Sequence, residues 1–475
     1  MDLSPDVVGF SFLLLGIFLI LGKLIRVYVT PLQKIFLPSS IIAGLLALFL
    51  GPEVIGLLVP GEVNLVHEGG LFPEPILEVW GVLPELLINV IFASLFLGKT
   101  IPHVKEVWNV AGPQITFAHF LSWGQYVVGI SLVLFFLTPV FGMNPLAGAL
   151  LEISFVGGHG TAAGLSGTFE AVGFEEGTDL AVGFATVGVL SGVIIGMVLV
   201  NWAARKGRTE IIDNPENFSE EKKVGLIKAE NQESAGKKTT RPEFIEPLTA
   251  HFAYIGLAIL IGFLLLEGLI LLEEFTWGPA TGVELMSYLP LFPLAMIGAV
   301  VVQLFMDKFI KHRTIDGEMI SRIQGFALDL LIVSALATLS VSVIGEYLIP
   351  FIIMSVAAIL WNVLALLYIA PRIMPDYWFE RAIGDFAQAM GMSAAGLLMI
   401  NITDPEEKSP ALKGFGYKQL FLDIIVGGGL FTASSVPLII LFGPATVLII
   451  AAVLMVAWLL VGLLYFGKKK STEES

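Results

Sequence analysis

Apolar segments recur along the whole chain, and they limit most strongly what it can fold into. Runs such as 7–20, 41–50, 127–137 and 445–464 are almost wholly hydrophobic. With their flanks, several reach the roughly 20 residues that a helix needs to cross about 30 Å of hydrocarbon. Only 14% of the 475 residues are charged, too few to cover a soluble protein of this length. We therefore expect an all-α polytopic membrane protein.

The basic residues predict the topology. Hydropathy predicts about eleven crossings. All 26 Lys and Arg residues then fall in alternate loops, whereas the loops 59–81, 140–178 and 273–285 have none. Because basic loops stay cytoplasmic, the N-terminus is predicted outside and the C-terminus inside. The predicted crossings are 7–27, 37–58, 82–98, 110–139, 179–204, 249–272, 286–306, 322–344, 348–370, 418–441 and 444–466.

Two more apolar segments do not fit this series of crossings. Residues 144–170 are interrupted at Gly157–Gly160, and residues 383–402 are interrupted near Gly391. A helix from 145 to 158 would rise only about 20 Å, which is too short to span. In the predicted topology both flanks of each segment lie on one side of the membrane. Each segment is therefore predicted to be a re-entrant hairpin.

The two hairpins share sequence, since Thr161–Leu165 reads TAAGL and Ser393–Leu397 reads SAAGL. Each half then has five crossings with a hairpin before the fifth, and an odd number of crossings inverts the second half. Matching broken segments in inverted repeats indicate a central solute site, although small residues also permit close helix packing. The predicted domains are a first repeat (1–204), a cytoplasmic linker (205–247), a second repeat (248–442), and an extra transmembrane helix with a cytoplasmic tail (443–475).

The hairpin tips are the candidates for substrate binding. The first N–H groups of a helix lack intrahelical partners and attract an anionic group, and glycine lets backbone approach a ligand closely. His159 is suited either to a substrate carboxylate or to capping neighbouring backbone. The predicted substrate-binding residues are Gly158, His159, Gly160, Thr161, Gly391 and Ser393.

Acids at membrane depth are candidates for binding the coupling ion, because an isolated carboxylate there is costly. Asp385 has Arg381 one helical turn before it, so a plain ion pair is the alternative. Asp329 lies close to the cytoplasmic edge of the membrane, so the alternative is that its carboxylate reaches the membrane–water interface and binds no ion. Hydroxyl, amide and carbonyl oxygens suit a hard cation. The predicted ion ligands are Asp329, Asp385, Ser154, Gln388 and Asn401, with no other metal site.

Several function classes are excluded or disfavoured. The absence of cysteine rules out disulfides and thiolate chemistry, and a net charge of −15 disfavours nucleic acid. The chain has no G-x-x-x-x-G-K-[ST] motif for ATP. Single scattered histidines disfavour a lipid-modifying enzyme, and two inverted hairpins favour alternating access over a channel. A secondary carrier of a small anionic solute, without a cofactor and driven by Na⁺ or H⁺, fits best.

The run Gly157–Ala162 (GGHGTA) resembles the hallmark of the bacterial sodium:glutamate symporter family. The similarity extends to Phe184–Gly188, to Pro38–Leu46 and to the five-plus-five layout; the second tip differs, with one glycine and no histidine. The resemblance implies Na⁺-coupled uptake of an acidic amino acid such as glutamate. It also implies a homodimer in the lipid of a bacterial or archaeal cytoplasmic membrane, with an elevator-type movement. The alternative is a proton-coupled or other organic-anion carrier of the same fold.

Overall fold

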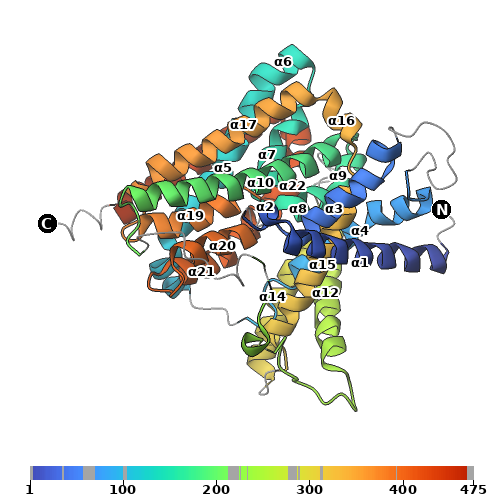
Figure 1. Cartoon of the computed structure of the whole chain (residues 1–475). Coiled ribbons are helices and arrows are strands. Elements are labelled where there is room, and N and C mark those ends of the chain that lie inside the picture. Colours follow the sequence, from blue (N-terminus) through green and yellow to red (C-terminus); the bar gives the residue numbers. More distant parts are fainter. Residues whose placement is uncertain are drawn as a thin grey trace. The chain divides into compact units, whose positions relative to one another are not determined.

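The computed structural model describes residues 4–34, 37–56, 70–99, 104–211, 224, 226–232, 234–276, 286, 289–310, 314–391 and 393–467. Within these ranges every regular element is a helix (Figure 1). Much of the predicted linker, including 212–223, and the tail from 468 onward lie outside the described residues.

Eleven of the described helices are long and apolar enough to cross a membrane, in agreement with the eleven predicted crossings. Their length and composition give the protein a membrane location. The spans are Pro5–Tyr28, Ser39–Gly56, Glu74–Ala93, Lys105–Phe141, Gly177–Arg205, Pro247–Phe275, Phe292–Phe309, Gly317–Ala337, Leu348–Ile373, Ala411–Phe442 and Pro444–Phe466.

The chain divides into two compact units, which we call unit 1 and unit 2. Unit 1 comprises Met1–Ile101, Ala163–Ala171 and Val224–Val341, and unit 2 comprises Pro102–Ala162, Val172–Lys223 and Ser342–Ser475. The predicted repeats, 1–204 and 248–442, do not coincide with these units. Each unit instead combines segments from both halves of the sequence.

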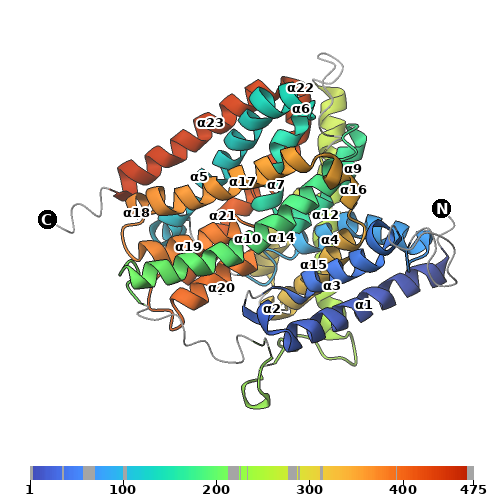
Figure 2. The same ribbon diagram turned by 45° about the horizontal axis from the view of Figure 1, so that its top comes forward.

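Unit 1 is built from helices of both halves. The helix α3 (Ser39–Leu50) packs against α1 (Pro5–Tyr28) and α15 (Gly317–Ala337), and α15 also packs against α4 (Glu74–Ala93). The helix α12 (Pro247–Phe275) lies along α14 (Phe292–Phe309), as Figure 2 shows. The shorter elements are α2 (Thr30–Lys34), η1 (Pro52–Gly56), α9 (Ser166–Ala171) and η4 (Ala229–Asn231), and α16 (Val341–Glu346) begins at the last residue of unit 1.

Small residues let α12 and α14 approach closely. A Cβ on Gly298 would lie 2.1 Å from the carbonyl oxygen of Ala258, and a Cβ on Gly262 would lie 2.4 Å from Ala295 N. Most of the α12 surface is nevertheless exposed and apolar, with Phe252 and Leu264 among the exposed side chains. Close contacts between small residues and exposed apolar faces are typical of helices in lipid.

Unit 2 is arranged around α5 (Val104–Leu132), which continues through η2 (Val133–Leu137) into α6 (Thr138–Phe141). It packs against α17 (Leu348–Leu364), α21 (Ala411–Ile425) and α23 (Pro444–Val461). The helix α10 (Gly177–Arg205) packs against α7 (Leu150–Phe155) and runs beside α17 in both views (Figures 1 and 2). The remaining elements are η3 (Pro145–Ala149), α8 (Gly158–Gly164, which ends in unit 1), η6 (Ala365–Ile369), α18 (Ala370–Ile373), α19 (Trp378–Gln388), α20 (Ser393–Thr403), α22 (Leu430–Phe442) and η7 (Gly462–Phe466).

Three helical segments that contribute to unit 2 are interrupted. The first break separates α7 from α8, and the second separates α19 from α20, both where the sequence predicts them. The third was not predicted: the crossing expected at 418–441 is interrupted between α21 and α22. Gly427 and Gly428 have φ values of +72° and +105° there, a conformation that glycine adopts without a Cβ penalty.

Candidate functional site

The tips of the first two breaks touch each other within unit 2. A Cβ on Gly158 would lie 2.3 Å from Gly391 O, and one on Gly391 would lie 2.3 Å from Val189 Cγ2 on α10. Their φ values are +71° and +149°, so a side chain at either position would be strained as well as crowded. Glycine is therefore required at both positions for the two backbones to meet.

His159, at the first tip, is anchored to α10. Its Nε2 lies 3.0 Å from Thr186 Oγ1, and Thr186 donates to Val182 O at 2.9 Å. Since the single hydroxyl proton of Thr186 is used in that bond, Nε2–H of His159 donates to Thr186. The ring is 3% exposed and ties the first tip to the helix that packs beside it.

Two buried hydroxyl groups flank the first break without a hydrogen-bond partner among the described residues. They belong to Ser154 in α7 and Thr161 in α8, whose side chains are almost fully buried. Thr161 lies against the break, because a Cβ on Gly157 would stand 3.0 Å from Thr161 Oγ1. Gly160 is the third residue of α8. A buried hydroxyl group without a hydrogen-bond partner destabilises a protein by about 1–3 kcal/mol. A bound solute or ion that contacts these two oxygens would remove this penalty, so they are suited to bind a ligand.

The second tip is fixed by two amide side chains that the sequence did not single out. Ala389 O, which follows the last turn of α19, accepts from Gln125 Nε2 at 2.9 Å and from Asn362 Nδ2 at 3.1 Å. The two amides also contact each other, with Gln125 Nε2 3.2 Å from Asn362 Oδ1. The helices α5 and α17 therefore hold the tip through one carbonyl group.

Asp385 forms an ion pair, but its partner is not the arginine considered from the sequence. Arg381 pairs with Asp376 at 2.6 Å, whereas Asp385 Oδ1 lies 2.7 Å from Lys418 Nζ. Lys418 lies in α21 with a fully buried side chain, so its assignment to a cytoplasmic loop is wrong. Its amine also donates to Gln388 Oε1 at 2.6 Å and stands 4.1 Å from the centre of the Phe415 ring.

Hydrogen bonds connect this ion pair to the second tip. Gln388 Nε2 donates to Gln419 Oε1 at 2.8 Å, and Gln419 Nε2 donates to Ser393 Oγ at 3.0 Å. Three predicted site residues, Asp385, Gln388 and Ser393, therefore belong to one network through α21. The second carboxylate oxygen of Asp385, Oδ2, is buried without a hydrogen-bond partner among the described residues.

Two predicted ion ligands lie outside this network. Asn401 is exposed on α20 and donates to Leu397 O of its own helix at 3.0 Å. Asp329 belongs to α15 of unit 1. Among the described residues, no group of three or more His, Asp or Glu side chains is placed to hold a metal ion.

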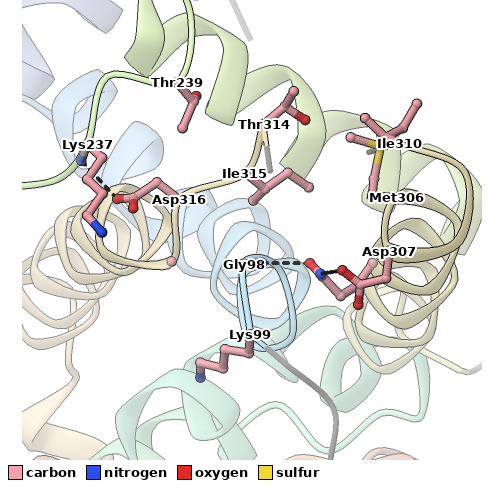
Figure 3. A pocket seen from close by; sticks show the side chains of 12 residues that line it. Gly98, Lys99, Lys237, Thr239, Met306, Asp307, Ile310, Thr314, Ile315 and Asp316 are labelled. Carbon is pink, nitrogen blue, oxygen red and sulfur yellow. Dashed lines mark hydrogen bonds between the residues drawn. The ribbon is translucent and has the colours of Figure 1, made fainter. Parts of the chain in front are cut away.

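Unit 1 contains a polar pocket of about 280 Å³, shown in Figure 3. The carboxylates of its two aspartates, Asp307 and Asp316, accept hydrogen bonds from neighbouring groups of the protein. Asp316 Oδ1 caps α15 by accepting from Met319 N, and it also accepts from Lys237 N. Asp307 accepts from Gln303, which in turn accepts from Gly98 N. The pocket thus joins the end of the linker to the start of α15, and it contains none of the predicted site residues.

The family model for the sodium/glutamate symporter matches residues 8–378. Proteins named sodium/glutamate symporter from Escherichia coli (strain K12) and Shigella flexneri are each 28% identical over 193 residues. The aligned part is 40% of this chain and 43% of each relative, so it spans less than half of their length. Because the family model covers most of the chain, this protein belongs to the sodium/glutamate symporter family.

Proposed function

We propose that the protein is a secondary active transporter that takes up an acidic amino acid such as glutamate together with Na⁺. The solute would bind where the first two breaks meet. The observation that carries this proposal is the contact between Gly158 and Gly391, where a Cβ would stand 2.3 Å from backbone. Discontinuous helices that come together near the bilayer midplane are typical of transporter substrate sites.

The chemistry of the two tips supports an anionic solute and a hard cation. Ser154 and Thr161 supply buried hydroxyl oxygens without a partner among the described residues, and the ligands of Na⁺ are of this oxygen type. Ser393 begins α20, an 11-residue helix whose first N–H groups favour a carboxylate. His159, Gly160 and Gly391 complete the proposed substrate contacts. Asp385 and Gln388 are proposed to act on the ion through their network with Lys418.

The proposed movement is of the elevator type, with two inverted repeats whose segments 144–170 and 383–402 are re-entrant hairpins. One compact unit would slide as a body while the other stays fixed in a homodimer. The division of the chain into two units, each drawing on both halves of the sequence, supports this proposal. Both tips that meet belong to unit 2, which makes unit 2 the proposed moving part.

The proposed location is a bacterial or archaeal cytoplasmic membrane, with the N-terminus outside. The chain has no cysteine, so single cysteines can be labelled without background. A thiol reagent that cannot cross membranes should reach a cysteine at Glu74 in intact cells, but not one at Lys408. Labelling of both positions from outside would contradict the proposed topology.

Uptake into proteoliposomes tests the function. Labelled acidic amino acids should accumulate under an inward Na⁺ gradient at fixed pH, and uptake should survive a proton ionophore with the membrane potential clamped. Neutral and basic amino acids serve as controls. Uptake that follows a pH gradient and ignores Na⁺ would favour a proton-coupled carrier of the same fold and contradict the proposal.

A further inference from the structure

An apolar groove of about 560 Å³ lies on unit 1, apart from the site described above. Its walls come from α4, α12 and α15, three helices that contact one another. The large side chains that line it are also exposed: Leu248 by 49%, Phe252 by 58% and Phe326 by 63%. Exposed apolar side chains on helices that are long and apolar enough to cross a membrane are placed to contact lipid.

The groove has one polar end. Arg322 and Thr249 line it near the first residues of α15 and α12. Phe326 and Phe252 line it about one helical turn further along the same helices, and Leu87 lines it from the last third of α4. A phospholipid has the same polarity, with a charged headgroup at the membrane edge and acyl chains that reach inward.

The guanidinium group of Arg322 is available to a ligand. Its ion-pair partner is Glu318, one turn earlier in α15, and the two side chains are 63% and 71% exposed. Their atoms are 3.9 Å apart, which is beyond hydrogen-bond distance. An arginine presents five N–H donors in a planar fork that binds phosphate oxygens in pairs. The phosphate of a phospholipid therefore suits Arg322.

Two carboxylates stand at the same end of the groove and narrow the choice of headgroup. Glu318 lies one turn from Arg322 on α15, and Glu246 caps α12 by accepting from Thr249 N at 3.1 Å. The nearby Lys237 lines the separate polar pocket of Figure 3. A purely anionic headgroup would meet both carboxylates and be repelled. A headgroup with an ammonium group beside its phosphate matches both signs of charge.

We propose that this groove is a binding site for a zwitterionic aminophospholipid, of which phosphatidylethanolamine is the simplest. Its phosphate would accept from Arg322, its ammonium group would donate to Glu318, and one acyl chain would lie along Phe252 and Phe326. A second copy of the chain seated here would bury the Arg322 donors without a phosphate to accept from them. The lipid would hold α12 against α4 and α15. The site goes beyond the proposed transport function and does not depend on it.

Native mass spectrometry of the purified full-length protein tests the headgroup. The probes are phosphatidylethanolamine, phosphatidylcholine and phosphatidylglycerol with identical acyl chains. The wild type should retain phosphatidylethanolamine best, because phosphatidylcholine has no N–H to donate and phosphatidylglycerol has no cation. Arg322→Gln should lower the affinity for phosphatidylethanolamine about tenfold, which corresponds to about 1.4 kcal/mol. Glu318→Gln should bind phosphatidylethanolamine no better than phosphatidylcholine.

The matched control is Arg205→Gln, which removes an exposed arginine at the end of α10 that does not line the groove. It should bind all three lipids as the wild type does. Equal retention of phosphatidylethanolamine by the wild type and Arg322→Gln would overturn the proposal, and so would a preference for phosphatidylglycerol.

A variant that fills the groove separates a lipid from a second copy of the chain. Thr249 is exposed at the mouth, so Thr249→Trp adds bulk there without disturbing the core. It should reduce the binding of all three lipids and leave the oligomeric state unchanged in the same spectra. A shift from dimer to monomer with unchanged lipid binding would show that a second copy fills the groove, and would overturn the proposal.

Cross-linking locates the acyl chain in a bilayer. Phosphatidylethanolamine with a photoactivatable group on one acyl chain should label peptides that contain Phe252 and Phe326 in the reconstituted protein. Excess unlabelled phosphatidylethanolamine should compete, and phosphatidylglycerol should compete less. Ile449, 65% exposed on α23, reports lipid contact outside the groove, and its labelling should not respond to competition. Equal labelling and equal competition at both places would overturn the inference.

Discussion

Lys418 Nζ lies 2.7 Å from Asp385 Oδ1, and both side chains are fully buried. The pair joins α19 to α21 beside the second tip, and Lys418 also donates to Gln388. A lysine amine therefore occupies the position beside Asp385 that a bound cation would otherwise fill. Asp385 and Gln388 both bind this buried amine, and Gln388 in turn donates to Gln419.

Removing one partner of the pair should be more harmful than removing both. Asp385→Asn leaves a buried ammonium group without its counter-charge and should lower the free energy of unfolding by about 3–5 kcal/mol. The double variant Asp385→Asn with Lys418→Met should recover most of that loss. Thermal unfolding in detergent measures both.

The exposed pair Lys408 and Glu406 is the matched control, because both side chains are mostly in solvent. Lys408→Met should leave the unfolding midpoint unchanged. Equal stability of the wild type and the single variant Asp385→Asn would show that the buried pair has been misassigned.

Gly158→Ala should abolish transport, because the new Cβ would collide with Gly391 O at 2.3 Å. Gly173 is a matched control: its φ is also +71°, but no atom lies within 4 Å of the position that a Cβ would take. Gly173→Ala should therefore cost only the left-handed strain of about 1–2 kcal/mol. Initial uptake rates, normalised to protein in the membrane, compare the two. Equal activity of both variants would contradict close contact of the tips.

Ser154→Ala and Thr161→Ala separate ligand binding from folding. Deleting a buried hydroxyl that has no partner should leave the stability of the ligand-free protein unchanged or slightly higher. If the hydroxyls hold solute or Na⁺, the apparent affinity for one of them should fall about tenfold, which corresponds to about 1.4 kcal/mol. Equilibrium binding of labelled glutamate at varied Na⁺ measures this.

Ser355 on α17 provides the control for these hydroxyl deletions. Its Oγ is also buried without a partner among the described residues, but it lies within an uninterrupted helix. Ser355→Ala should change neither stability nor affinity. A loss of affinity as large as that of Ser154→Ala would mean that the effect is general and not specific to the first tip.

Features that depend on local sequence could be predicted. Long apolar runs give the eleven helical stretches of the described residues that are long and apolar enough to cross a membrane, and Gly157–Gly160 and Gly391 mark the first two breaks. The resemblance carried by the glycine-histidine run is confirmed by the family match. The third break has a sequence signal, the run Gly427–Gly429, but the long apolar run around it predicts one continuous crossing.

Features that depend on distant partners could not be predicted. Lys418 follows Asp385 by 33 residues, and only the packing of α19 on α21 makes it a buried counter-ion instead of a loop lysine. Glu152 is fully buried in α7 and accepts a hydrogen bond from Gly427 N–H. Its donor Gly427 is 275 residues away, so nothing in its own segment reveals the hydrogen bonds around it.

The most direct test of the proposed binding site is an experimental structure determined with Na⁺ and L-glutamate. Glutamate density is expected against the two tips, in contact with residues 158 to 161 of the first tip and with Gly391 and Ser393 of the second. A cation is expected among the oxygens of Ser154 and Thr161. Glutamate in the polar pocket of unit 1, beside Asp316 and Lys237, with both tips unoccupied, would contradict the proposed site.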